Sequence, residues 1–174
     1  MKSIHFCQFL LSDNPNWKKC NEYDALGDAP VPLLYKKLNL LYQNSKFRLV
    51  IRQKEKWLES MKWMFKHGKV IWNWGKDIHD YHERFYGVRS FNKRILSEHW
   101  EKYHADVNSY FSNRPDSLLT IELEKGFKSD EICSFLSIPT REIKHTQKNR
   151  RRNAKLINRI KYNTKYYYQL LKKI

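Results

Sequence analysis

Apolar positions recur at helical spacing in several segments of the chain. In residues 32–43 the stripe consists of leucines, and Pro32 suits the first turn of a helix. Residues 55–68 carry a similar stripe, and Gly68 at its end is expected to cap that helix. The same spacing predicts helices in two more segments, residues 91–114 and 129–138. For residues 72–87 the pattern is weaker and predicts a loop with a short helix.

Two segments instead show the continuous apolar runs that are typical of buried strands. They are KFRLVIR, at residues 46–52, and SLLTIELE, at residues 117–124. The opening residues, MKSIHFCQFLL, read as a further strand or an irregular chain start. Because helical segments separate these runs, we predict an α/β fold, a parallel sheet with flanking helices. In this class, ligands bind beyond the carboxyl ends of the strands.

The distribution of charge divides the chain into a body and a tail. The net charge is +16, but residues 144–174 hold 11 of the 34 Lys and Arg residues and no acid. This leaves 23 basic and 18 acidic residues, a net charge of +5, for residues 1–143. We therefore predict an α/β domain over 1–143 and a basic amphipathic helical tail over 144–174. The tail either docks on the domain or contacts a polyanion such as nucleic acid.

Composition excludes several classes of protein. An aromatic content of 15% argues against disorder, and no apolar run is long enough for a transmembrane segment. The cysteines, Cys7, Cys20 and Cys133, are odd in number and widely spaced, so they support neither a disulfide framework nor a zinc site. These features favour a reducing, cytoplasmic setting. His79 and His82, three residues apart, leave a zinc site as an alternative, but they lack a well-spaced third ligand.

Arg52 stands at the carboxyl end of the clearest strand, directly before a predicted helix. The positive end of that helix and the guanidinium group would together favour an anion. Ser60, in the second turn, adds a hydroxyl if the helix start bends toward it. The alternative is that Arg52 pairs with a carboxylate of the protein surface.

At this point the residues resemble a known family. The run YDALGDAPVPLLYKKLNLLYQNSKFRLVIRQKEKWLESM is similar to the P-loop sulfotransferase superfamily, and so are HADVNSYF, RPDSLLTIEL and GFKSDEICSFLSIP. The resemblance covers about residues 22–140, with the elements in the same order. It implies a fold like that of the P-loop nucleoside triphosphate hydrolases. It also implies transfer of a sulfuryl group from phosphoadenosine phosphosulfate (PAPS) to a hydroxyl or amine of a small-molecule or glycan acceptor.

The resemblance also implies roles for individual residues. Arg52 and Ser60 match the arginine and serine that bind the phosphate on the donor's ribose, although Gln53 and Lys54 replace the family's Asp-Pro. Asp28, in GDAP, matches a position near the carboxylate that takes the acceptor's proton, and Asp24 is its weaker substitute. A turn or capping role is the alternative for either aspartate. The resemblance implies no metal.

One departure from the family concerns the donor's phosphate loop. None of the five glycines lies in a glycine-rich run with a following Lys and Ser, so the fold is expected to be incomplete at its N-terminus. Without that loop, sulfuryl transfer is expected to be impaired. The alternative function is a non-catalytic module that binds nucleic acid or another polyanion through the tail.

Overall fold

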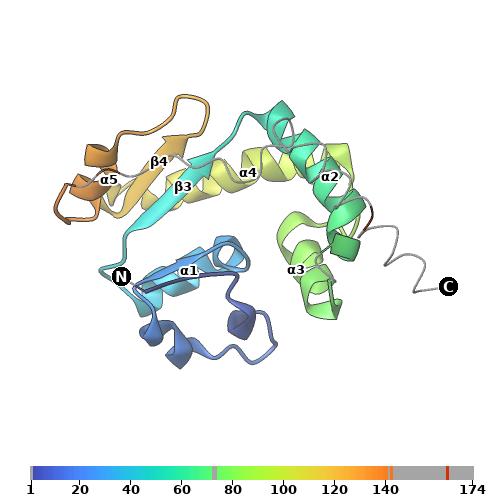
Figure 1. Cartoon of the computed structure of the whole chain (residues 1–174), viewed down its shortest axis with the longest axis horizontal. Helices are drawn as coiled ribbons and strands as arrows, with labels where there is room; N and C mark the ends of the chain where they lie inside the picture. Colours follow the sequence, from blue (N-terminus) through green and yellow to red (C-terminus); the bar gives the residue numbers. More distant parts are fainter. Residues whose placement is uncertain (1, 72–73, 141, 143–163, 165–174) are drawn as a thin grey trace. The chain divides into compact units, whose positions relative to one another are not determined.

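The computed structural model describes residues 2–71, 74–140, 142 and 164 (Figure 1). The chain divides into two compact units. The first unit comprises Met1–Phe47 and Trp74–Leu118, and the second comprises Arg48–Asn73 and Leu119–Ile174. The architecture is mixed α/β, as predicted. The predicted tail, residues 144–174, lies outside the described residues apart from Thr164.

The first unit contains a small parallel sheet. Strand β1 (Ser3–His5) pairs with β2 (Ala25–Gly27), so that Ile4 lies opposite Leu26. The chain between the strands forms two short 3-10 helices, η1 (Gln8–Leu10) and η2 (Trp17–Glu22). These elements close over a core of four buried residues, Cys7, Leu10, Cys20 and Leu38. The opening residues are therefore part of the folded body, as the strand interpretation predicted.

Two helices of the first unit confirm the periodicity of the sequence. Helix α1 (Val31–Leu41) has its proline in the first turn, and α4 (Lys93–Phe111) is capped by Asn92, whose side chain accepts a hydrogen bond from Ile95 N. The two helices are tied together by Asp106. It accepts hydrogen bonds from the Tyr35 hydroxyl, at 2.5 Å, and from Lys36 Nζ, at 2.6 Å. These contacts lower the pKa of the Asp106 carboxyl, with the Lys36 bond as the largest cause.

The segment that the sequence predicted as a loop with a short helix is described from residue 74 onward and contains more helix than expected. Helix α3 (Lys76–Tyr86) runs for 11 residues and ends at Gly87, whose φ of +74° gives the left-handed cap that favours glycine. Its buried face carries Ile78, Tyr81 and His82. The prediction missed this face because histidine and tyrosine count as polar or ambiguous in a hydrophobic pattern. Their rings nevertheless pack with other aromatic side chains.

The strands predicted at 46–52 and 117–124 are also present. Strand β3 (Phe47–Ile51) pairs with β4 (Leu118–Glu122), and η3 (Pro115–Ser117) precedes β4. Leu123 N donates to Ile51 O at 2.8 Å, so the carboxyl ends of the two strands meet. Within the described ranges the predicted sheet is thus represented by two sheets of two strands each.

Two helices complete the second unit. Helix α2 (Lys54–Ile71) follows β3 almost at once, and α5 (Ser129–Phe135) follows β4 (Figure 1). The expectation that Gly68 caps α2 is wrong, because the helix continues to Ile71 and Gly68 is a buried residue within it. A glycine inside a helix costs only about 1 kcal/mol relative to alanine, which packing can offset.

All three cysteines are buried free thiols, Cys7 and Cys20 in the first unit and Cys133 in the second. Burial is the largest cause that raises the pKa of the Cys7 and Cys20 thiols. Across the described part of the chain, no helix combines the length and the apolar character that crossing a bilayer requires.

Candidate functional site

The predicted pair of Arg52 and Ser60 lies together at the start of α2. Arg52 follows the last residue of β3, and its Nη1 donates a hydrogen bond of 2.5 Å to Ser60 Oγ. Ser60 in turn donates to the Lys56 carbonyl at 3.1 Å, a bond back to the preceding helical turn. The spacing of eight residues therefore brings the guanidinium group and the hydroxyl into contact. Their role in binding phosphate stays a prediction.

A third side chain at this place, Glu124, was missed by the sequence reasoning. It follows β4 and accepts a hydrogen bond from Gln53 N at 3.2 Å. Its Oε1 lies 3.9 Å from Arg52 Nε and 3.7 Å from Lys56 Nζ, distances of ion pairs rather than of hydrogen bonds. The alternative in which Arg52 pairs with a surface carboxylate is therefore also realised.

These groups form what we call the α2 anion site, defined by Arg52, Gln53, Lys56, Ser60 and Glu124. Two cations, one hydroxyl and one backbone N–H meet at the N-terminus of an 18-residue helix, where the helix dipole favours negative charge. The Arg52 side chain remains 39% exposed, so a ligand in solution can reach it. All five residues belong to the second unit.

One atom of the α2 anion site lacks the contact that burial usually demands. Arg52 Nε is buried and makes no hydrogen bond within the described part of the chain. A buried N–H group without an acceptor costs free energy, and an oxygen of a bound anion would remove that cost. The residues present therefore fit a phosphate group, which offers several acceptor oxygens to a guanidinium.

The two aspartates proposed as a base lie in the first unit. Asp28 follows β2 and is exposed, and its Oδ1 accepts a hydrogen bond of 2.8 Å from Ala29 N. Its φ of +64° places the residue in a left-handed turn, which aspartate tolerates. Asp24 accepts a 2.5 Å bond from Lys2 N and so links the starts of β1 and β2. Both side chains thus serve the local turns, and a catalytic role for either stays a prediction.

The first unit also contains a cleft that the sequence did not reveal. Its volume is about 480 Å³, within the range of small-molecule sites. Its apolar lining comes from the following residues: Leu10, Leu11, Pro30, Leu33, Leu34 and Tyr81. Burial is the first cause that raises the pKa of the Tyr81 phenol above its usual value, and the charges of Tyr86 and Asp28 add to the rise.

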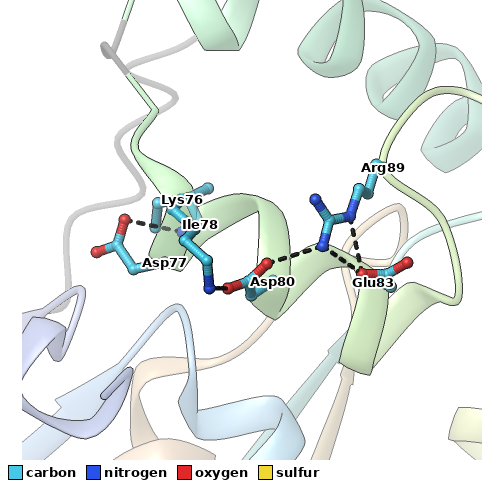
Figure 2. Close-up of polar contacts among 6 residues, drawn as sticks. All are labelled: Lys76, Asp77, Ile78, Asp80, Glu83 and Arg89. Carbon is cyan, nitrogen blue, oxygen red and sulfur yellow. Dashed lines mark hydrogen bonds and ion pairs between the residues drawn. The ribbon is translucent and has the colours of Figure 1, made fainter. Parts of the chain in front are cut away.

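Most of the polar lining of this cleft comes from α3, where an ion-pair network lies on the helix surface (Figure 2). Lys76 Nζ lies 2.5 Å from Asp80, and Arg89 bridges Asp80, at 2.9 Å, and Glu83, at 2.6 Å. Asp77 accepts a bond of 2.9 Å from Ile78 N in the first turn. The acids that could have joined a histidine in binding zinc are therefore engaged with cations.

The histidines of α3 and α4 lie among aromatic rings. The His82 ring is 4.5 Å from the Trp74 ring, and His99 is 4.6 Å from Phe85. His104 Nδ1 lies 2.6 Å from the Trp100 carbonyl oxygen, within hydrogen-bond distance of the preceding helical turn. Among the residues that the structure describes, no three potential ligands gather as a metal site.

Comparison with known proteins gives one match. A family model described as "Sulfotransferase domain" matches residues 12–154, which include the α2 anion site and both candidate aspartates. No curated protein matches the chain.

Proposed function

We propose, from the premise that this chain belongs to the sulfotransferase domain family, that it binds PAPS or its product at the α2 anion site. Arg52 and Ser60 would hold the phosphate on the ribose, and Lys56 would add a second positive charge. The observation that carries this proposal is the contact between Arg52 and Ser60 at the start of α2. The buried Nε of Arg52 supports it, since that N–H has no acceptor among the described residues.

The reaction proposed for this family member is sulfuryl transfer to a hydroxyl or amine. The acceptor atom bonds to sulfur, the bond from sulfur to the donor's phosphate oxygen breaks, and adenosine 3′,5′-bisphosphate leaves. The attacking group must lose its proton, and Asp28 is the candidate base because its carboxylate is exposed and fixed by Ala29 N. Because the 174 residues contain no glycine-rich phosphate loop, we expect this chain to bind nucleotide better than it turns PAPS over.

Nucleotide binding tests the proposal directly. Replacement of Arg52 by alanine should weaken adenosine 3′,5′-bisphosphate by about 1.5–3 kcal/mol, the usual worth of a hydrogen bond to a charged group. Isothermal titration calorimetry at low salt measures this change. The matched control is Arg48→Ala, which removes an exposed arginine of β3, the strand that Arg52 follows, and should leave the affinity unchanged. Equal effects of the two substitutions on a measurable affinity would refute the assignment.

A second candidate function rests on the charge of the tail. Residues 144–174 carry 11 basic side chains and no acid, so we propose that they contact a polyanion such as nucleic acid. A variant that ends at Ile143 should lose most of its affinity for heparin or single-stranded RNA. Binding by the full chain should fall steeply between low and physiological salt, because counterions are released. An unchanged salt slope in the shortened variant would show that the basic surface lies in residues 1–143.

A further inference from the structure

Glu124 occupies the place in the α2 anion site where an anionic ligand would be expected. Its carboxylate accepts the Gln53 N–H at the helix start and lies between Arg52 and Lys56. These are the same groups that an incoming phosphate would use. The side chain is 23% exposed, so it sits in the site rather than extending into solvent.

The carboxylate is held by weak contacts. Its one hydrogen bond at the site is 3.2 Å long, and its two ion pairs, at 3.9 and 3.7 Å, are beyond hydrogen-bond distance. Its partners are partly exposed, 39% for Arg52 and 49% for Lys56, so solvent screens both pairs. A phosphate group, with more charge and more acceptor oxygens, can make shorter and stronger contacts to the same donors.

The backbone around Glu124 allows the side chain to leave. Glu124 lies in the turn that follows β4, where Lys125 N donates to the Glu122 carbonyl at 3.0 Å. The Glu124 side chain is 23% exposed and is not among the buried core residues, so it can rotate away without rearrangement of a packed core.

We propose that Glu124 is an internal competitor for the phosphate of the nucleotide. In the ligand-free protein it neutralises part of the charge on Arg52 and Lys56, and a bound phosphate displaces it. The inference rests on the proposed function, since it assumes that the α2 anion site binds the nucleotide. Its consequence is a lower affinity for the nucleotide than Arg52, Lys56 and Ser60 would give alone. Glu124 thus sets how tightly the nucleotide is held.

The test is a comparison of two charge-removing substitutions in the full chain. Glu124→Gln should tighten adenosine 3′,5′-bisphosphate about threefold to tenfold, the scale of a partly exposed charge pair. The matched control is Glu122→Gln, which removes the same charge two residues away. Glu122 pairs with Lys125, at 2.8 Å, and its side chain is 52% exposed. We expect this control to change the affinity less than twofold in calorimetric titrations at low salt.

The outcomes separate this inference from the proposed function. Tighter binding by Glu124→Gln alone supports the inference, and so does binding by that variant when the unmodified chain binds nothing measurable. If the unmodified chain binds the nucleotide and Glu124→Gln binds it equally or more weakly, Glu124 does not compete and the inference fails by itself. If no variant binds, the proposed function fails and the inference with it. Circular dichroism melting curves check that both variants are folded.

Discussion

Acidification from neutral pH to pH 4 should remove much of the stability of the first unit. Burial lowers the pKa of His82 and of His99, each to about 4 from an ordinary value of 6.5. The folded state therefore favours the neutral rings, and the unfolded chain binds more protons between these two values. The stability that the two neutral rings contribute is present in full above pH 6.5 and falls as the pH drops toward 4. Below pH 4 these rings cause no further loss. Each ring contributes up to about 3 kcal/mol to the loss.

Urea unfolding at several pH values measures this effect. The variant His99→Phe keeps an aromatic ring against Phe85 and Tyr103 but cannot titrate, so its stability should fall less on acidification. The control His5→Gln alters an exposed histidine and should follow the unmodified chain. Equal losses of stability in the unmodified chain and in His99→Phe would show that protonation of the His99 ring does not destabilise the folded state. Asp106, whose pKa is lowered, adds its own loss at a more acidic pH.

Phe111→Ala should destabilise the protein by about 3–5 kcal/mol, the usual cost of removing a buried phenylalanine ring. Phe111 is 2% exposed and ends α4. Its ring lies 5.1 Å from that of Phe47, 5.0 Å from Tyr110 and 6.1 Å from Tyr35. The ring thus joins α1, α4 and the first residue of β3, and its loss leaves a cavity that these elements cannot close without moving.

Denaturant midpoints provide the measurement for this series. Phe111→Leu retains much of the apolar volume, so its effect should be smaller than that of Phe111→Ala. Leu40→Ala, at a side chain that is 67% exposed on α1, is the control and should change the free energy of unfolding by less than about 0.5 kcal/mol. A loss below about 1 kcal/mol for Phe111→Ala would mean that the three rings repack around the gap.

The sequence predicted those elements whose apolar residues follow one clear period. The leucine stripe of α1 and the apolar run of β3 are examples, and both lie close to their predicted bounds. Helix α3 was underestimated because its buried face includes His82 and Tyr81, residues that a hydrophobic pattern does not count as core. Local patterns therefore succeed where burial coincides with hydrophobicity and fail where aromatic polar rings fill the core.

The candidate site shows the same division between local and long-range information. Arg52 and Ser60 are eight residues apart on one strand–helix connection, so their contact follows from local geometry. Glu124 lies 71 residues after Gln53, and only the pairing of β3 with β4 brings them together. A sequence that predicts both strands does not say that they are neighbours. Had that pairing been assumed, the last residue of SLLTIELE would have been a candidate for the site.

The reactivity of the buried thiols can report the local opening of the structure around them. A thiol reacts with an alkylating reagent as the thiolate, and burial both shields Cys7 and Cys20 and raises their pKa. Labelling of these two cysteines therefore proceeds only while the first unit is open. Cys133, fully buried in α5, records the opening of the second unit in the same sample. Mass spectrometry of the labelled peptides would give a separate opening rate for each unit, without an introduced probe.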